Sequence, residues 1–237
     1  SCFALGCPIL PVYQGELQCI GLGMDVAFVD DQGNTLAEGK GELICRQTFP
    51  SMPSGFWNDP ENEKYKAAYF SRFENVWSHG DYGEIIKHHD SEDQLIQTCV
   101  MIHGRSDAVL NPGGVRIGTA EIYRQVEKVD EVFESIAIAQ TWKDDVRIIL
   151  FVTLKDNMHL NESLIGKIKN SIRQNTTPRH VPSKVIQVSD IPRTLSGKIV
   201  EVAVKKVVDG LPVNNTEALA NPEALELFKN ISELQQD

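Results

Sequence analysis

The sequence predicts an α+β protein in two parts, a β-rich N-terminal part and a small α+β domain that follows it. Apolar strand-like stretches separated by Gly, Pro, Asn and Asp fill the first hundred positions. After about residue 105 the patterns run helix, strand, strand, helix, strand, helix, an order typical of a small α+β domain. We therefore predict a boundary near residues 104–107, between a part at 1–106 and a part at 107–237.

The N-terminal part begins with a predicted β-hairpin. Residues 24–29 are an apolar strand, residues 30–34 are turn formers, and residues 41–45 are the returning strand. A proline-bounded loop is expected at 50–60, and a short helix near 61–70. The pattern therefore favours a mainly β structure with one small helix.

The C-terminal part begins with a predicted helix at 119–129. Its apolar side chains recur at helical spacing, and Gly118 or Thr119 can cap its first turn. Two strands are then expected, at 135–140 and 147–154.

Three more helical segments and one strand are expected in the rest of the C-terminal part. Asn161 is a natural N-cap for a helix with one apolar face, and a strand at 184–189 follows it. A helix is expected at 199–208. Asn221-Pro222 predicts a capped helix start, since Pro suits the first turn.

The charge and hydropathy exclude several functions. Asp and Glu number 33 against 23 Lys and Arg, which gives a net charge of −10. Because a nucleic-acid partner would require a basic face, we expect no nucleic acid to bind. No run of about 18 apolar residues predicts a membrane span, and no N-terminal pattern predicts a secretory signal. We expect a cytoplasmic protein without a membrane partner, and the first residue, Ser1, suggests a piece of a longer chain.

The five cysteines are scattered and show no Cys-x-x-Cys spacing. That spacing would be expected of a zinc site, and an even number of cysteines would be expected of a disulfide framework. We therefore expect reduced cysteines, as in a cytosolic protein, and no metal site.

A Gly-Asp pair gives the first candidate for ligand binding. Asp81 follows Gly80 within the segment 76–83. A carboxylate accepts two hydrogen bonds side by side, which suits the vicinal hydroxyls of a ribose. We expect a tight turn that exposes this carboxylate, and the alternative is a hairpin turn with no ligand.

Two arginines beside a glycine-rich segment give the second candidate. Arg105 and Arg116 carry planar guanidinium groups that suit phosphate or ribose oxygens. Gly113 and Gly114 would let the backbone approach a ligand closely. The alternative is a glycine-rich loop with solvated arginines.

Lys198 ends the polar segment Thr194-Leu-Ser-Gly-Lys and gives the third candidate. We expect a flexible loop that presents one mobile cation. The segment lacks the G-x-x-x-x-G-K-[ST] phosphate-binding pattern, because Pro192 replaces its first glycine and Ile199 its hydroxyl residue. The alternative is an ordinary surface lysine.

Three further polar residues are weaker candidates. Arg173, near the end of the Asn161 helix, could reach an anionic group or be a solvated helix arginine. His79 and His103 are interpreted as packing or turn histidines rather than as catalytic groups.

The order of these segments resembles the adenylate-forming superfamily of acyl-CoA synthetases. Gly-Asp is followed by Gly-Arg-x-Asp, by Gly-Gly-x-Arg-Ile with a helix that carries Glu121, and by Ser-Gly-Lys near the end. The resemblance covers essentially the whole chain and corresponds to the last third of such an enzyme. It implies that 1–106 is the β-rich end of the large adenylation domain and that 107–237 is a mobile lid domain with an extended tail.

Within the superfamily the chain is more similar to the acetoacetyl-CoA synthetases. This similarity lies in the stretches 10–18, 76–81, 110–123 and 202–225. His79, where many relatives have Thr, also fits the acetoacetate branch. The alternative is another short-chain ligase, such as an acetyl-CoA synthetase.

The resemblance implies a nucleotide site in this chain. Asp81 would hold the ribose hydroxyls of ATP and AMP, Arg105 would add a ribose contact, and Arg116 would meet a nucleotide phosphate. Mg²⁺ is also implied, although the sequence does not identify its ligands.

The resemblance implies catalytic, coenzyme A and hinge residues as well. Lys198 would be the catalytic lysine of adenylation, and Asp107 the hinge about which the lid swings. Gly114 would lie against the pantetheine arm of coenzyme A, and Arg173 near its nucleotide.

The implied activity of the parent is the ligation of acetoacetate and coenzyme A, driven by cleavage of ATP to AMP and diphosphate. The loop that grips the phosphates and most of the acyl pocket would lie upstream, in the missing N-terminal part. We therefore expect this piece alone to catalyse nothing. The alternatives are a stand-alone nucleotide-binding module and a purely structural domain with a coincidental Ser-Gly-Lys.

Overall fold

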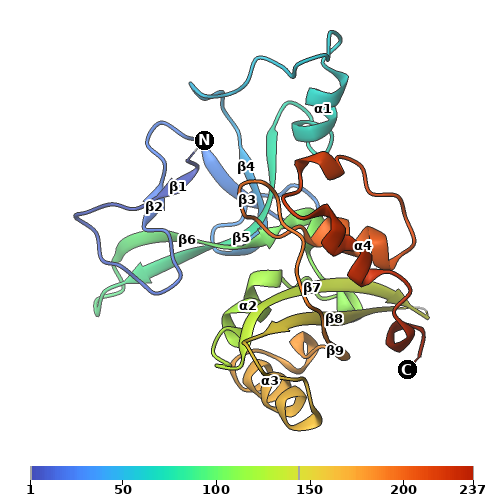
Figure 1. The fold of residues 1–237 in the computed structure, drawn as a ribbon. Helices are drawn as coiled ribbons and strands as arrows, with labels where there is room; N and C mark the ends of the chain where they lie inside the picture. Colours follow the sequence, from blue (N-terminus) through green and yellow to red (C-terminus); the bar gives the residue numbers. More distant parts are fainter. Residues whose placement is uncertain (1, 144, 237) are drawn as a thin grey trace. The chain divides into compact units, whose positions relative to one another are not determined.

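The computed structural model describes residues 2–143 and 145–236 and divides the chain into two compact units (Figure 1). Unit 1 is Ser1–Ser106 and unit 2 is Asp107–Asp237. Among the described residues, no helix is both long and apolar enough to cross a membrane. Both units combine strands with helical segments, which confirms the predicted α+β class.

Unit 1 is built on an antiparallel sheet in the order β3-β4-β5-β6. Its strands are β3 (Val26–Val29), β4 (Gly39–Cys45), β5 (Trp77–His89) and β6 (Leu95–Arg105). The short strands β1 (Ala4–Leu5) and β2 (Cys19–Ile20) form a separate pair. The predicted hairpin at 24–45 is confirmed as β3 and β4.

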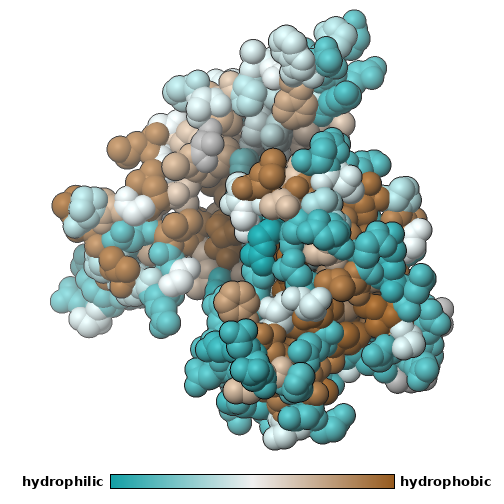
Figure 2. Space-filling view, in the orientation of Figure 1, coloured by the Kyte–Doolittle hydropathy of each residue, from teal (hydrophilic) through white to brown (hydrophobic). Residues whose placement is uncertain are grey.

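Aromatic residues dominate the core of unit 1. Helix α1 (Glu63–Tyr69) brings Tyr69 onto the ring of Trp77, with ring centroids 3.8 Å apart. Phe28 and Val100 are fully buried beneath them. Other large apolar side chains, including Leu22 and Trp57, are almost fully exposed, and Figure 2 shows apolar groups among the polar surface.

Unit 2 is a three-stranded sheet covered on both faces. β7 (Val132–Trp142) and β8 (Asp145–Leu154) are antiparallel, and β9 (Lys184–Gln187) joins β8 in parallel. One face packs against α2 (Thr119–Val126) and α3 (Glu162–Asn175). The other face packs against α4 (Glu201–Val208) and the C-terminal tail.

The helix caps of unit 2 agree with the sequence in two places and differ in a third. Gly118 is the N-cap of α2, and the Asn161 side chain accepts the N–H of Leu164 at 2.9 Å to cap α3. Asn221 makes no cap hydrogen bond to the short 3₁₀ segment Pro222–Phe228. Its side chain instead accepts the N–H of Arg193 at 2.9 Å, so it joins two loops.

Candidate functional site

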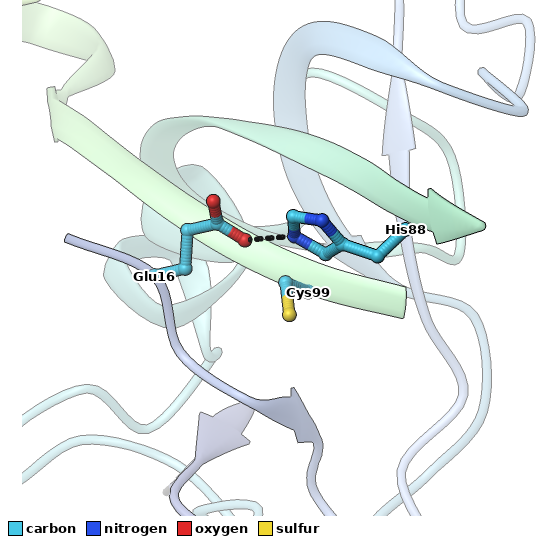
Figure 3. A group of neighbouring side chains, drawn as sticks. All are labelled: Glu16, His88 and Cys99. Atoms are coloured by element: carbon cyan, nitrogen blue, oxygen red, sulfur yellow. Dashed lines mark hydrogen bonds and ion pairs between the residues drawn. The ribbon is translucent and has the colours of Figure 1, made fainter. Parts of the chain in front are cut away.

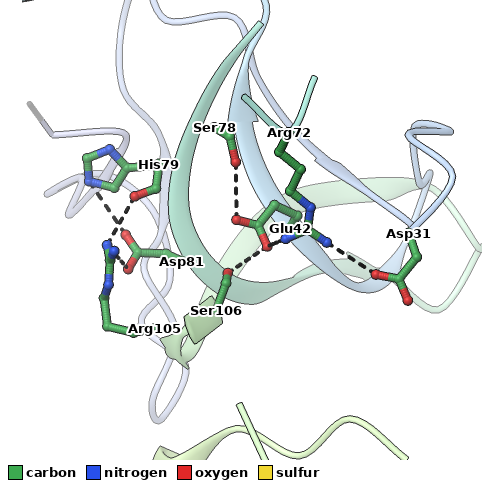
Figure 4. A network of polar contacts seen from close by, with 8 residues as sticks. All are labelled: Asp31, Glu42, Arg72, Ser78, His79, Asp81, Arg105 and Ser106. Carbon is green, nitrogen blue, oxygen red and sulfur yellow. Dashed lines mark hydrogen bonds and ion pairs between the residues drawn. The ribbon is translucent and has the colours of Figure 1, made fainter. Parts of the chain in front are cut away.

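Asp81 and Arg105 lie side by side on neighbouring strands of unit 1. The two residues pair directly in the β5–β6 register. Arg105 Nη1 lies 3.5 Å from Asp81 Oδ1 and donates to the carbonyl of His79 at 3.0 Å (Figure 4). The Asp81 side chain keeps 23% of its surface exposed. A partly exposed carboxylate with only long side-chain contacts can still accept hydrogen bonds from the hydroxyl groups of a ligand.

Gly80 lets the strand bring this pair together. Its φ is +78°, in the left-handed region that glycine adopts without strain. A Cβ at this position would lie 2.7 Å from Arg105 Nη2. The expected tight turn is therefore wrong, because Gly80 and Asp81 lie inside β5, at an irregular position of the strand.

His79 faces the same carboxylate, but its burial opposes protonation of the ring. Burial lowers the pKa of His79, the Asp81 charge opposes that effect, and Arg105 adds to it. Trp77 Nε1 donates to His79 Nδ1 at 3.1 Å, and the ring lies 4.5 Å from that of Phe3. These contacts agree with the interpretation of His79 as a packing residue.

His103, the other histidine of the analysis, is also held inside unit 1. Its ring is 2% exposed, and Nε2 lies 2.9 Å from Glu84 Oε2. It therefore has a packing role as well.

A second carboxylate of unit 1, Glu42, is buried and fully engaged. It is 1% exposed, and Ser78 and Ser106 donate to it at 3.3 and 2.6 Å. Arg72 Nη1 lies 2.5 Å from Oε2 and reaches Asp31 at 3.2 Å with its other nitrogen (Figure 4). Ser106 directly precedes Asp107, so this network fixes the chain at the end of unit 1.

The glycine pair of unit 2 presents bare backbone. Gly113 and Gly114 have φ of +57° and +76°, and a Cβ on either would meet nothing within 4 Å. The N–H of Gly113 donates to Asp145 Oδ1 at 3.1 Å. The pKa of Asp145 is lowered because it accepts the backbone N–H groups of Val146 and Gly113. Asp145 therefore holds the backbone of this segment, while the space where a Cβ would lie is open at both glycines.

Lys198 lies in a tight hairpin turn rather than in an irregular loop. Thr194 N–H donates to the Lys198 carbonyl, and Gly197 N–H to the Thr194 carbonyl, both at 2.8 Å. Leu195 N–H donates to the carbonyl of Ala218, which ties the turn to the tail. The Lys198 side chain is exposed, and within residues 2–143 and 145–236 no group pairs with its ammonium.

The structure separates the candidate residues of unit 2 into two groups. Arg116 lies in the segment between Leu110 and Ile117, which pack in the core on the α2–α3 side. Arg173 is exposed on the last turn of α3 on that same side. The Lys198 turn is tied to the tail, whose apolar residues pack on the opposite face of the sheet. Gly113 contacts Asp145 at one end of the β7–β8 pair, whereas Arg193, which pairs with Ile199 next to Lys198, contacts Glu134 near the other end. Gly114 and Lys198 therefore lie toward opposite sides of unit 2.

Sequence reasoning missed Glu42 and its partners. Its donors come from positions 30, 36 and 64 residues away, so no local motif marks the site. The available signal was a Glu directly before the apolar run Leu43-Ile-Cys45, because an unpaired carboxylate is costly to bury.

Known proteins match the whole chain. Acetoacetyl-coenzyme A synthetase of Rhizobium meliloti is 58% identical over 234 residues, and the match covers 99% of this chain and 35% of that protein. Acetoacetyl-CoA synthetase of Gallus gallus is 43% identical over 236 residues, which cover 99% of this chain and 34% of that protein. The chain thus spans about a third of the length of these curated relatives. No family model matches the chain.

Solved structures agree in fold. The acetoacetyl-CoA synthetase of Streptomyces lividans superposes with a TM-score of 0.86 at 39% identity, over 100% of this chain and 35% of that one. An amide bond synthetase of Marinactinospora thermotolerans gives 0.62 at 20% identity over 81% of this chain and 35% of that one, a likeness of fold alone.

Over nearly its whole length, the chain is similar to acetoacetyl-CoA synthetases. The matches extend over both units. The chain corresponds to a C-terminal portion of these proteins, about a third of their length.

Proposed function

We propose that the full-length protein is an ATP-dependent ligase that forms acetoacetyl-CoA from acetoacetate and coenzyme A, with AMP and diphosphate as the other products. The observation that carries this proposal is the 58% identity to the rhizobial synthetase across nearly the whole chain. The acyl group would first be joined to AMP, and the thiol of coenzyme A would then displace AMP.

Unit 1 provides the groups suited to the nucleoside. Asp81 has two carboxylate oxygens, and their contacts to His79 and Arg105 are both 3.5 Å long. Two neighbouring ribose hydroxyls would donate shorter, charge-assisted hydrogen bonds to the same oxygens. Arg105, whose side chain is 52% exposed, would add a donor beside them. This set of donors and acceptors fits a ribose, and in the same proposal Arg116 of unit 2 would meet a phosphate.

Lys198 provides the charge that adenylation requires. An acyl carboxylate and the α-phosphate are both anionic, so a compact cation must offset their repulsion. Lys198 suits this role because its ammonium is exposed and unpaired among the described residues, and the hydrogen-bonded turn fixes its backbone.

The two sides of unit 2 suit the two half-reactions. Lys198 would serve adenylation, and the open Gly113–Gly114 backbone would lie along the pantetheine arm during thioester formation. Because the two groups belong to opposite sides of the unit, they would act in turn, through rotation about Asp107. Arg173 would contact the nucleotide of coenzyme A from the Gly114 side. Mg²⁺ would accompany ATP.

The hinge can be tested with Asp107→Pro, which fixes φ at this position. We expect the full-length variant to lose one half-reaction far more than the other, since the lid would be held in one orientation. Diphosphate exchange measures adenylation, and release of AMP from supplied acyl-adenylate and coenzyme A measures thiolation. Equal losses in both would contradict a hinge at Asp107.

The activity itself is tested on the full-length protein with acetoacetate, acetate and propionate. The expected result is a higher kcat/KM for acetoacetate, measured as thioester formed with ATP and coenzyme A. A preference for acetate would support another short-chain synthetase instead. Binding of AMP without thioester from any of the three acids would support a nucleotide-binding module.

A further inference from the structure

A glutamate, a histidine and a cysteine from three separate segments meet in unit 1. Cys99 lies in β6, His88 in β5, and Glu16 in the segment before β2 (Figure 3). One oxygen of Glu16, one ring nitrogen of His88 and the sulfur of Cys99 all lie within 4.8 Å of one another. The proposed ligase chemistry uses none of these residues.

The fold fixes each of the three side chains. His88 pairs with Gln97, and Ile86 with Cys99, so the histidine and the cysteine share one face of the sheet. Leu17 exchanges two backbone hydrogen bonds with Val100, at 2.7 and 2.9 Å, which holds the neighbouring Glu16 against β6.

The ring of His88 is also held in place. The ring of Tyr13 stacks on it, with a centroid distance of 3.6 Å and an interplanar angle of 7°. Nε2 of His88 points at Oε2 of Glu16, 2.8 Å away. The imidazole therefore presents one nitrogen toward the carboxylate.

We propose that Glu16, His88 and Cys99 bind one divalent ion, with Zn²⁺ as the best suited, and so fasten the segment that carries Glu16 to the sheet. Thiolate, imidazole and carboxylate are the three ligand types that proteins offer to Zn²⁺. With metal–ligand distances of about 2.0–2.3 Å, tetrahedral geometry puts ligand atoms roughly 3.3–3.6 Å apart. The Glu16–His88 pair would open slightly and the cysteine sulfur would move inward, shifts of about 1 Å that side-chain rotation can supply.

The charges of the site would balance. Binding breaks the S–H bond of Cys99 and releases its proton to solvent, so one thiolate and one carboxylate neutralise the dication. His88 binds as the neutral ring. Burial and the neighbouring Glu16 raise the pKa of the Cys99 thiol to about 11, so a metal-free Cys99 is no activated nucleophile.

Gln97 is a buried residue beside Cys99. Its side chain contacts the Cys99 thiol, and the residue is only 5% exposed. Its amide nitrogen donates to the carbonyls of Pro11 and Gln18, at 3.2 and 3.0 Å. Its Oε1 has no hydrogen-bond partner among the described residues. The two hydrogen bonds of the Gln97 amide nitrogen hold the segment 11–18, which carries Glu16, beside β6.

This proposal departs from the expectation of no metal site. That expectation rested on Cys-x-x-Cys spacing, which detects only ligands close together in the sequence. The three ligands here are 72 and 11 positions apart, and the strand register brings them together.

The test is a metal titration of the full-length protein without nucleotide. After dialysis against a chelator, Zn²⁺ should bind at one equivalent, and Co²⁺ should give the near-ultraviolet charge-transfer band of a thiolate ligand. Cys99→Ala should abolish that band. His88→Gln and Glu16→Gln should each weaken Zn²⁺ binding by more than the ~10–100-fold typical of an outer-shell partner.

Matched variants control for general effects of substitution. Cys45→Ala removes another buried thiol, and His89→Gln removes the exposed neighbouring histidine. Both should bind Zn²⁺ like the wild type. Absence of a thiolate–Co²⁺ band in the wild type would overturn the proposal whether or not the variants fold. So would equal Zn²⁺ affinity in the wild type, Cys99→Ala and His88→Gln.

Discussion

Glu42 and Asp81 are two carboxylates of one sheet, and their surroundings differ in almost every respect. Glu42 is 1% exposed and takes three side-chain contacts of 2.5–3.3 Å. Asp81 is 23% exposed, and its contacts to His79 and Arg105 are both 3.5 Å long. A carboxylate whose oxygens are occupied stabilises the fold, whereas one with weak contacts has acceptor capacity left for a ligand. We therefore expect Glu42 to act in stability and Asp81 in binding.

Asp81→Asn should give the largest effect on substrate binding. The substitution keeps the shape but removes the charge and one acceptor oxygen. Loss of charge-assisted hydrogen bonds of about 1.5–3 kcal/mol predicts a KM for ATP roughly 10–100-fold higher. The melting temperature should hardly change, since the contacts of Asp81 are long. Asp93→Asn, in an exposed turn, is the matched control, and an unchanged KM for ATP in Asp81→Asn would remove Asp81 from the site.

Glu42→Gln should give the opposite result. The amide would turn a donor toward Arg72 or a serine hydroxyl, and Arg72 would lose its buried counter-charge. Because Arg72 is partly exposed, we expect a loss of about 1–3 kcal/mol in the free energy of unfolding. Urea unfolding measures this loss, with the exposed Glu38→Gln as control. A large rise in the KM for ATP without destabilisation would reverse the assignment of the two carboxylates.

Gly80→Ala tests how the backbone prepares the Asp81–Arg105 pair. The positive φ should cost about 1–2 kcal/mol, and the new Cβ would displace the Arg105 guanidinium. Gly39→Ala is the matched control, since its φ is +102° but no atom lies within 4 Å of its Cβ. Both variants should lose stability, but only Gly80→Ala should raise the KM for ATP. Equal KM values for the two variants would show that the position of Arg105 does not matter.

His79 should give the smallest effect, a dependence of stability on pH. Its pKa is lowered in the folded state, so the unfolded chain binds more protons at acidic pH. Stability is therefore greatest above the ordinary pKa of 6.5 and falls as the pH decreases from there to the lower folded-state pKa. His79→Gln should flatten this part of the stability–pH curve, whereas the exposed His159→Gln should leave it in place. A curve unchanged by His79→Gln would contradict burial of a neutral ring.

The sequence predicts local features of this fold better than long-range ones. The hairpin at 24–45 and the Asn161 cap follow from neighbouring residues, and both are confirmed. The local sequence Gly80-Asp81 predicts a turn, but the pairing of Asp81 with Arg105 of β6 keeps these residues inside strand β5. The sequence predicts Asn221 as a helix cap, but its side chain accepts a hydrogen bond from the Arg193 N–H of another loop instead.

The candidate site shows the same limit. The residue types and the order of the motifs indicate Asp81, Arg105 and Lys198 as candidate site residues, because each lies in a short sequence motif. Glu42 and the Glu16–His88–Cys99 group depend on register and on loops folded over the sheet, so no window of sequence contains them.

The most direct test separates the two half-reactions in Lys198→Ala of the full-length protein, with the exposed Lys155→Ala as control. Diphosphate exchange should fall by roughly 10²–10³-fold, the usual cost of removing one preorganised electrostatic contact. Thioester formation from supplied acetoacetyl-adenylate and coenzyme A should stay near the wild-type rate. Diphosphate exchange near the wild-type level in Lys198→Ala would contradict the account.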